Sequence, residues 1–206
     1  MKGKPLKLYL NKPSPYARLA LVVAHEKGVA DRLDLEWTDP WKNPVELCGV
    51  NPFSRVPALV TDDGVVIVDS GCICDYFDRL GGGRALVPAG LPARVATLRK
   101  YGLARTLTDA TFGAVIQRRF GPAGTEPALA ARWIAAAGSA LDAMEQDSPM
   151  GGTACAPDLG DLALAVGLGY IDFRLKEMAW RQDRPTLAGW FRAMNARPSM
   201  QATPHE

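Results

Sequence analysis

The sequence predicts two parts, an α/β unit over about its first 80 residues and an all-helical remainder. Before residue 80, short apolar runs alternate with stretches of helical spacing, an order typical of a compact α/β unit. A glycine triplet at 81–83 then opens a run that contains proline and glycine. Beyond it almost every segment has helical periodicity and no strand-like run occurs. We therefore expect domains at 1–80 and 93–206, joined by a linker at 81–92.

The first elements of the chain are predicted to be a strand, a helix and a second strand. A short apolar run at 6–10 predicts the first strand. Helical spacing follows over 14–28, with Ser14 as the N-cap and Pro15 at the first helical position, where its missing N–H costs nothing. Residues 33–37 return to strand character. This β-α-β opening favours a right-handed crossover and a parallel pair of strands.

A hairpin and a helix complete the predicted α/β unit. Residues 57–61 and 65–68 have strand character, and the Asp-Asp-Gly between them is a hairpin signal. Ser70 then begins a helix that runs to about Leu80. The second half is expected to hold four helices, at 94–119, at 127–146, at 158–176, and from near Pro185 to before Pro198.

The composition is that of an ordinary globular protein, with 48% hydrophobic and 22% charged residues. A net charge of +2 gives no polybasic surface, so we expect no nucleic-acid partner. The apolar run near the start is too short for a signal peptide, and no stretch approaches the roughly 20 apolar residues of a membrane helix. We expect a cytoplasmic protein that binds no membrane.

Cysteine and histidine are too sparse to indicate a metal centre or a disulfide framework. The four cysteines include no CxxC motif and suit a reducing compartment, and two histidines make a His-based zinc site improbable. These residues are Cys48, Cys72, Cys74, Cys155, His25 and His205.

Ser14 is the first candidate functional residue, because it stands where a strand ends and a helix begins. Free N–H groups and the helix dipole favour an anion at such a point, and a serine hydroxyl adds one hydrogen bond. A free thiol has a pKa of about 8.5, and one charge-assisted hydrogen bond of about 1.5–3 kcal/mol suffices to lower it by one to two units. The alternative is a plain N-cap serine.

Two further fragments suit the remainder of a zwitterionic thiol peptide. A trans bond is the default before Pro57, but a cis bond would turn the backbone N–H and C=O of Val56 outward, toward an extended peptide. Asp69 and Ser70 end a strand and begin a helix, which suits an ammonium group and a carboxylate on one carbon. Alone, each fragment is also an ordinary turn or cap.

Seven fragments stand in an order and spacing that a known family shares. They are Ser-Pro-Tyr-x-Arg at 14–18, Glu-Lys-Gly at 26–28, Asn-Pro-x-x-x-Val-Pro at 51–57, Asp-Ser at 69–70, Asp-Leu-Gly-Asp at 158–161, Arg-Pro-x-Leu at 184–187 and Arg-Pro-Ser at 197–199. In these the chain resembles the glutathione S-transferase superfamily, and within it a group of small bacterial members. The resemblance implies a homodimer whose subunit has a thioredoxin-like domain of order β-α-β-α-β-β-α and an all-α domain.

The resemblance also implies glutathione as co-substrate, with no permanently bound cofactor. Val56 and a cis Pro57 are then expected to hold the cysteinyl backbone, and Asp69 and Ser70 the γ-glutamyl end. Asp69 replaces a commoner Glu, which shortens its reach. Lys42 is expected either to meet the glycine carboxylate or to be a solvated lysine.

Ser14 decides the expected chemistry, since related proteins with a cysteine there attack disulfides and a serine cannot. We expect a detoxification-type transferase that stabilises the glutathione thiolate for attack on a small hydrophobic electrophile. The alternatives are a glutathione-binding protein without turnover, and a glutathione-dependent lyase, isomerase or dehalogenase. Tyr16 competes with Ser14 for the thiol contact or else lines the pocket. Arg18, one turn beyond Ser14, is expected to form a structural ion pair or to add positive potential.

The second substrate is expected between the domains, beside the long helix at 94–119. Tyr101, Arg105 and Phe112 are the candidate residues, at helical spacing, and the alternative is that they are core or dimer contacts. Elsewhere, Cys72 and Cys74 are expected to be buried packing residues. The acidic pair in 158–161 is expected to be a capping box that serves folding.

Overall fold

The chain forms two compact units in the computed structural model, which describes residues 5–147 and 156–206. The first unit comprises Met1–Leu86 together with Pro198–Glu206 from the other end of the chain. The second unit comprises Val87–Arg197.

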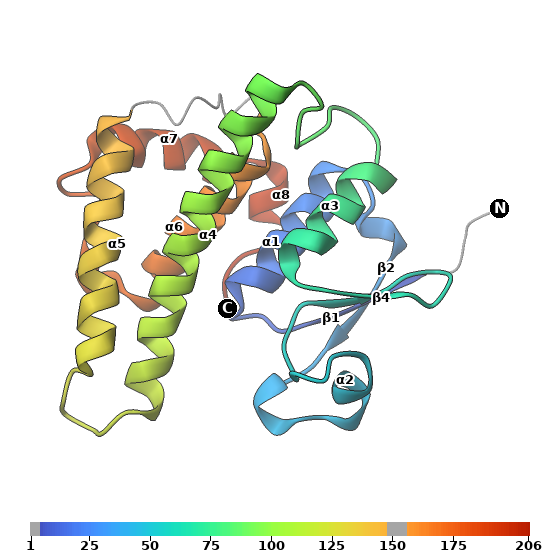
Figure 1. The fold of residues 1–206 in the computed structure, drawn as a ribbon, viewed down its shortest axis with the longest axis horizontal. Coiled ribbons are helices and arrows are strands. Elements are labelled where there is room, and N and C mark those ends of the chain that lie inside the picture. The colour runs from blue at the N-terminus through green and yellow to red at the C-terminus, as the bar shows by residue number, and fades with distance from the viewer. Residues whose placement is uncertain (1–4, 148–155) are drawn as a thin grey trace. The chain divides into compact units, whose positions relative to one another are not determined.

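The first unit is a four-stranded sheet with helices, and it confirms the predicted order β-α-β-α-β-β-α (Figure 1). In chain order its elements are β1 (Leu6–Leu10), α1 (Pro15–Glu26), the 3₁₀ turn η1 (Ala30–Arg32), β2 (Leu33–Trp37), the 3₁₀ turn η2 (Pro40–Lys42), α2 (Val45–Val50), β3 (Ala58–Val60), β4 (Val66–Val68), α3 (Ser70–Leu80) and, from the chain end, α8 (Pro198–Gln201).

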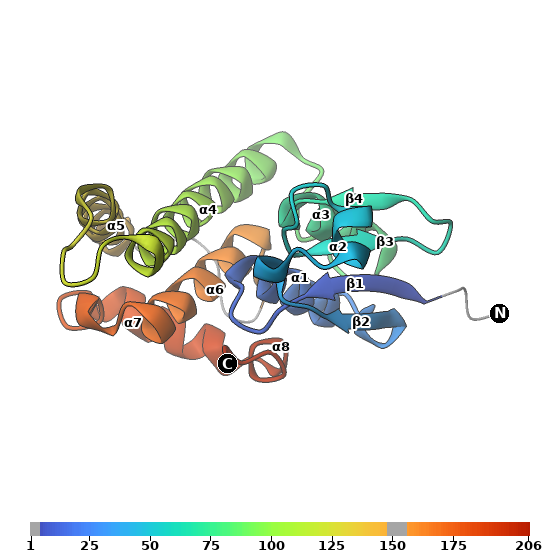
Figure 2. The ribbon, with the colours of Figure 1, turned by 90° about the horizontal axis from the view of Figure 1, so that it is seen from below.

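The strands follow one another across the sheet in the order β2-β1-β3-β4, which can be traced in Figure 2. β1 and β2 are parallel, while β3 is antiparallel to both β1 and β4. Tyr9 near the end of β1 lies opposite Ala58, the first residue of β3, and Ala58 lies opposite Val68, the last residue of β4. The final residues of β1 and β2 are also partners. Three strands therefore end, and β3 begins, at one edge of the sheet, here called the carboxyl edge.

Helices α1 and α3 pack side by side, and α3 also packs against β3 and β4 (Figure 1). The core is built from side chains that are fully removed from solvent, including Leu8, Leu59, Ile73 and Phe77. α1 ends as predicted: Lys27 is its C-cap, and Gly28 takes a φ of 66°, a left-handed conformation that glycine adopts without a Cβ penalty.

The regular elements of the second unit are all helices within its described residues. Its elements are α4 (Leu91–Phe120), α5 (Ala128–Gln146), α6 (Leu159–Arg174), the 3₁₀ turn η3 (Lys176–Met178) and α7 (Pro185–Asn195). α6 is buried along most of its length and packs against α4. In the ranges that the structure describes, no helix combines the length and the apolar character needed to cross a membrane.

Helix α6 begins with the predicted capping box. Asp158 accepts the backbone N–H of Asp161 at 3.0 Å, and Asp161 accepts the backbone N–H of Asp158 at 3.0 Å. The ammonium of Lys100 forms ion pairs with both carboxylates, at 2.7 Å to Asp158 and 2.8 Å to Asp161. The Thr97 hydroxyl also donates to Asp158. The two acids are thus satisfied by each other's backbone N–H groups and by a buried lysine of α4.

Several element boundaries differ from the prediction by one to three residues. α4 begins at Leu91 rather than Arg94, because Pro92 lies in the first turn, where a helix does not use the missing N–H. α6 ends at Arg174, and Lys176 instead begins η3. The segment before β3 forms the short helix α2, which is the second helix of the expected order.

One cysteine prediction is wrong. Cys74 is fully buried on the face of α3 that also carries Ile73 and Phe77, but Cys72 is exposed. The two residues are separated by about 200° around the helix, so one apolar face cannot bury both. Cys155 lies outside the described residues.

Candidate functional site

The carboxyl edge of the sheet gathers the four segments that carry the candidate glutathione residues. The segments after β1, β2 and β4 and the segment before β3 all leave the sheet there. Ser14 and Tyr16 follow β1, and Lys42 follows β2. Val56 and Pro57 come just before β3, and Asp69 and Ser70 follow β4. In open α/β sheets the carboxyl ends of strands are the usual place for a ligand.

Ser14 is the N-cap of α1, as predicted, and is 7% exposed. Its Oγ accepts the backbone N–H of Ala17 at 3.2 Å, which uses one lone pair and leaves the hydroxyl hydrogen available to donate. The first turn of α1 carries no acidic residue, so no side-chain charge there neutralises the positive end of the helix dipole. The geometry suits an anion that accepts the Ser14 hydroxyl.

Tyr16 lies in the same turn, two residues after Ser14, and is half-buried. It follows Pro15 as the second residue of α1. Whether Ser14 or Tyr16 contacts a bound thiol stays a prediction, with the N-cap hydroxyl favoured by its position at the helix end.

The Val56–Pro57 peptide bond is cis. Sheet pairing of β3 begins at Ala58, so the backbone of Val56 lies outside the ladder. Its side chain packs on the small cluster of Tyr9, Leu47 and Ala58, which fixes the residue beside β1 and α2. The main chain of Val56 is therefore held in place by its side chain while its polar groups stay outside the sheet.

The loop before the cis bond is braced by Asn51, a buried residue whose role the sequence did not reveal. Its side-chain amide donates to the carbonyl of Arg55 at 2.8 Å, and its carbonyl accepts the backbone N–H of Phe53 at 3.1 Å. The Ser54 hydroxyl donates to the carbonyl of Pro40 at 3.0 Å, which ties this loop to η2. The asparagine of the Asn-Pro fragment is thus a signal for a braced loop.

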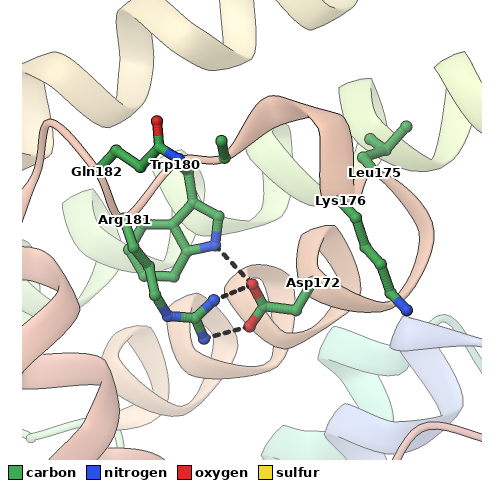
Figure 3. Close-up of a pocket in the computed structure, with 7 residues that line it drawn as sticks. Asp172, Leu175, Lys176, Trp180, Arg181 and Gln182 are labelled. Atoms are coloured by element: carbon green, nitrogen blue, oxygen red, sulfur yellow. Dashed lines mark hydrogen bonds and ion pairs between the residues drawn. The ribbon is translucent and has the colours of Figure 1, made fainter.

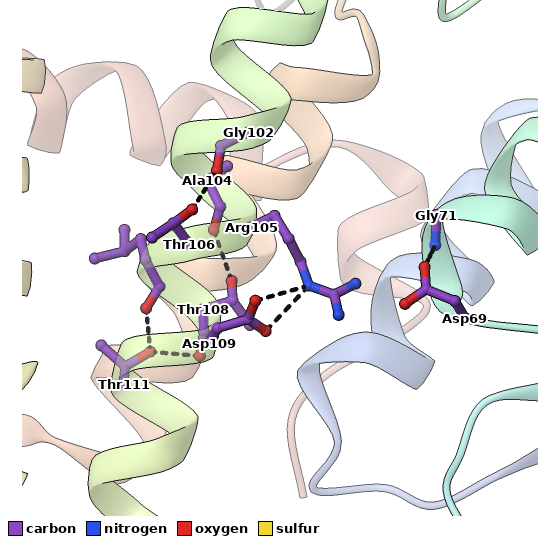
Figure 4. Close-up of polar contacts among 10 residues, drawn as sticks. Asp69, Gly71, Gly102, Ala104, Arg105, Thr106, Thr108, Asp109 and Thr111 are labelled. Atoms are coloured by element: carbon purple, nitrogen blue, oxygen red, sulfur yellow. Dashed lines mark hydrogen bonds and ion pairs between the residues drawn. The ribbon is translucent and has the colours of Figure 1, made fainter.

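Asp69 is the N-cap of α3, and its carboxylate accepts the backbone N–H of Gly71 at 2.7 Å (Figure 4). The side chain is exposed, whereas Ser70 is 2% exposed. Asp69 has φ 77° and ψ 129°, a conformation that a residue with a Cβ rarely takes and that costs about 1–3 kcal/mol. Such strain is concentrated at binding sites, because the rest of the fold must hold the residue in place.

Lys42 is the last residue of η2 and is exposed. In the part of the chain that the structure describes, its ammonium forms no ion pair. Lys42 is accordingly available to a carboxylate at the carboxyl edge. A lysine that is only solvated would look the same in this structure, so both roles stay predictions.

Arg18 does not form the expected ion pair with any described residue. It is 6% exposed, and its guanidinium donates to two backbone carbonyls, from Nε to Thr203 at 2.5 Å and from Nη2 to Met200 at 3.4 Å. Burial lowers the pKa of Arg18 to about 10. The sequence could not predict this, because the partners lie more than 180 residues away.

The three candidate residues for a second substrate lie on α4, in the second unit. Arg105 pairs with Asp109 one turn further on, at 3.0 Å (Figure 4). Phe112 packs on the buried Tyr170 of α6, with ring centroids 6.3 Å apart, and burial raises the pKa of Tyr170 to about 12. Tyr101 is half-buried. For Phe112 this is the packing role that the sequence left open as the alternative.

A hollow of about 400 Å³ lies in the second unit beside the end of α6 (Figure 3). Asp172 at its wall accepts the indole N–H of Trp180 at 2.9 Å and both ends of the Arg181 guanidinium. Arg181 also stacks over Trp180, 4.7 Å from the ring centroid. These three groups satisfy one another, and Lys176 and Gln182 also line the hollow. Within the described residues no cluster of three or more His, Cys, Asp or Glu side chains could hold a metal.

Known protein families match both units. The family described as "Glutathione S-transferase, N-terminal domain" matches residues 13–80, and the family described as "Glutathione S-transferase, C-terminal domain" matches residues 127–193. The first match contains all four segments of the carboxyl edge.

Individual proteins are similar over almost the whole chain. The "Uncharacterized GST-like protein YibF" of Escherichia coli K12 is 27% identical, over 96% of this chain and 98% of that protein. The crystal structure of a glutathione transferase family member from Pseudomonas fluorescens Pf-5, with bound glutathione, is 32% identical with a TM-score of 0.91, and the match covers 98% of this chain and 99% of that one. A structure with bound S-(propanoic acid)-glutathione, from the same organism, is 31% identical with a TM-score of 0.85, over 98% and 97% of the two chains.

Proposed function

The chain belongs to the glutathione S-transferase superfamily, and we propose that it binds glutathione and stabilises the thiolate for attack on a small hydrophobic electrophile. The observation that carries this is the N-terminus of α1. There the Ser14 hydroxyl is positioned by Ala17, and no carboxylate in the first turn opposes an anion.

In the proposed complex glutathione lies along the carboxyl edge of the sheet. Its sulfur meets Ser14, its cysteinyl backbone pairs with Val56, and its γ-glutamyl end meets Asp69 and Ser70. Lys42 faces the glycine carboxylate, and Tyr16 lines the pocket near the sulfur. Glutathione bound to the similar Pseudomonas fluorescens protein supports this ligand.

The proposed chemistry is differential stabilisation of the thiolate over the thiol. Each unit by which the thiol pKa falls corresponds to about 1.4 kcal/mol, and one charge-assisted hydrogen bond supplies about 1.5–3 kcal/mol. The thiolate then forms a carbon–sulfur bond to the electrophile, whose leaving group departs with the bonding electron pair. Because the N-cap residue is a serine, it forms no disulfide with glutathione, and the proposed cycle is noncovalent with respect to the protein.

The electrophile is proposed to meet Tyr101 and Arg105, with Phe112 contributing to the support behind them. The S-(propanoic acid)-glutathione bound to a similar protein supports a ligand substituted on sulfur. Because the propanoic acid substituent carries a carboxylate, we favour Arg105 over Tyr101 as its contact, since a guanidinium matches a carboxylate geometrically.

We further propose a cytoplasmic homodimer that serves detoxification. Light scattering should then give a molar mass about twice the 22.2 kDa of one chain. A monomer at working concentration would contradict the dimer without touching the glutathione site.

The decisive experiment is titration of glutathione bound to the protein, followed by the ultraviolet absorbance of the thiolate. A thiol pKa lowered by at least one unit from its free value supports the transferase. Binding with an unchanged thiol pKa would instead favour a glutathione-binding protein without turnover. A panel of aryl halides, epoxides and haloalkanes, analysed for conjugate or dehalogenated product, then separates conjugation from lyase, isomerase or dehalogenase chemistry.

A further inference from the structure

Arg18 is a buried cation for which the described residues provide no anion. It lies one helical turn after Ser14 on α1, and both residues belong to the buried face of that helix. Its guanidinium donates hydrogen bonds to the neutral carbonyls of Thr203 and Met200. A charge removed from water is normally paired with an opposite charge, because neutral partners recover only part of its solvation.

The chain end that supplies these carbonyls runs along α1 in the opposite direction. The Ser199 hydroxyl donates to Glu26 at the end of α1, the Thr203 carbonyl accepts from Arg18 in the first half of α1, and Glu206 pairs with Lys12 just before the helix begins. The guanidinium is therefore held by the chain end, from outside α1.

The carboxylates that form ion pairs or hydrogen bonds around α1 do so with groups other than Arg18. On α1 and the elements that pack against it, Asp78 pairs with Lys27, Asp75 with Arg79, Asp62 with Arg32 and Glu206 with Lys12, and Glu26 accepts the Ser199 hydroxyl. The further titratable side chains there are Tyr16, His25, Asp31, Cys72, Cys74, Tyr76 and His205.

We propose that Arg18 is a second, buried source of positive potential that favours the ionised form of a thiol bound at Ser14, acting through the field and without touching the sulfur. Residues four apart on a helix are neighbours, and helical side chains lean toward the helix N-terminus. Arg18 therefore lies one helical turn from the point where the thiolate would lie. This inference rests on the proposed function and adds a residue to the same site.

The expected size of the effect follows from Coulomb's law. A unit charge roughly 8–10 Å from the sulfur, at an effective dielectric constant of about 20, changes a thiol pKa by about one unit. That is comparable with the effect of the Ser14 hydroxyl, so removing either group should be measurable by itself.

The test is Arg18→Gln, which removes the charge but keeps an amide donor for the Thr203 carbonyl. The pKa of bound glutathione is expected to rise by about one unit, and kcat/KM at neutral pH to fall about tenfold, with recovery at higher pH. The affinity for S-methylglutathione, which has no ionisable thiol, should stay within a factor of about two. Arg79→Gln is the matched control: it removes an exposed arginine that pairs with Asp75 on α3, and it should leave the thiol pKa unchanged.

The outcomes separate this inference from the proposed function. If the native protein binds no glutathione, or binds it with an unshifted thiol pKa, the proposed function fails and the inference with it. If the native thiol pKa is lowered and Arg18→Gln leaves it lowered, only the inference fails. Equal losses of affinity for glutathione and S-methylglutathione would assign Arg18 a purely structural role. Should Arg18→Gln not fold, Arg18→Lys decides: it keeps the charge, so a return of the thiol pKa to the free value contradicts the inference.

Discussion

At the scale of single residues, the Ser14 hydroxyl can cap α1 and bind a ligand at the same time, because its oxygen accepts one hydrogen bond while its hydrogen donates another. Its oxygen accepts the N–H of Ala17 and caps α1, while its hydrogen remains for a ligand. A cysteine at the same position would cap poorly but would itself be a nucleophile. The following two predictions use this difference.

Ser14→Ala should remove the hydrogen bond to the thiolate and leave the remainder of the glutathione site. The pKa of bound glutathione should rise by about one to two units, and kcat/KM toward an aryl halide should fall roughly 10- to 100-fold at neutral pH. Loss of the cap also costs about 1 kcal/mol of stability. Ser139→Ala, on the exposed surface of α5, is the control. Unchanged kinetics in Ser14→Ala would point to Tyr16 as the thiol contact.

Ser14→Cys should convert the N-cap into a disulfide-forming group. A thiol at a helix N-terminus has a lowered pKa, so its thiolate attacks oxidised glutathione and releases one glutathione thiolate. Intact-protein mass spectrometry after incubation with oxidised glutathione should show one added glutathionyl group that a reductant removes. Because the exposed Cys72 is present in both proteins, the native chain treated in parallel gives the background.

At the scale of elements, α4 and α6 approach closely because Gly160 has no side chain. A Cβ added there would lie 2.5 Å from Cβ of Lys100, 2.9 Å from the backbone nitrogen of Tyr101 and 3.0 Å from the carbonyl of Thr97. Two of these are backbone atoms of α4 and cannot move alone. The glycine therefore sets the helix separation at which Lys100 can reach the capping box.

Gly160→Ala should separate the two helices and destabilise the protein by about 1–3 kcal/mol in chemical denaturation. Gly189→Ala is a matched control in the exposed middle of α7, where an added Cβ meets no atom within 4 Å. There alanine should be neutral or stabilise by up to about 1 kcal/mol, since it favours the helix. Equal stability of the two variants would contradict the close approach of α4 and α6.

Helix α7 is capped by another element. Its own N-cap residue, Arg184, offers no side-chain cap, and the carboxylate of Glu145 on α5 accepts the N–H groups of Thr186 and Leu187 at 2.8 and 2.7 Å. Partial burial by itself raises the pKa of Glu145, but these two N–H groups outweigh it, so the pKa is lowered in the folded protein.

Glu145→Gln should accordingly make the protein less sensitive to acid. Since the folded pKa is lowered, the stability that the carboxylate contributes is present above its unfolded pKa of about 4.3 and is lost as the pH falls through the folded value. The variant should be slightly less stable than the native protein at neutral pH, and the difference should vanish below that window. Melting temperatures across this range measure it, and a constant difference at every pH would contradict the capping role.

At the scale of the whole molecule, the chain end is part of the first unit. Residues 198–206 follow the helical unit in sequence but pack along α1, where Met200 is 1% exposed. The first unit is therefore not complete when the first 86 residues have been made. The position of α1, and with it Ser14, depends on the last residues of the chain.

A chain that ends at Arg197 should lose the buried Met200 and both carbonyls that accept from Arg18. Burial of one such side chain is worth about 1.5–3 kcal/mol, which corresponds to a melting temperature lower by about 3–12 °C. Removing Glu206 alone deletes only an exposed ion pair and should change the melting temperature little. Two truncations with the same melting temperature would show that the chain end does not stabilise α1.

Local features of this fold could be predicted, and distant pairings could not. The start of α1 at Ser14 and its end at Gly28 follow from a cap, a proline and a glycine that are adjacent to the helix. The capping box of α6 likewise lies within four residues. The exposure of Cys72 was not predicted. Cys72 and Cys74 are only two positions apart in the sequence, but on a helix their side chains point in different directions.

The sequence by itself determined the order of the elements, the caps, and the four segments that carry the candidate glutathione residues, because each is encoded by neighbouring residues. Only the tertiary structure decided that these segments leave the sheet at one edge, since that depends on the register of β1, β3 and β4. It likewise decided the partners of Lys100 and Arg18, which lie about 60 and more than 180 residues away. A charged side chain buried by folding takes the partners that the chain brings to it, and no local pattern records which those will be.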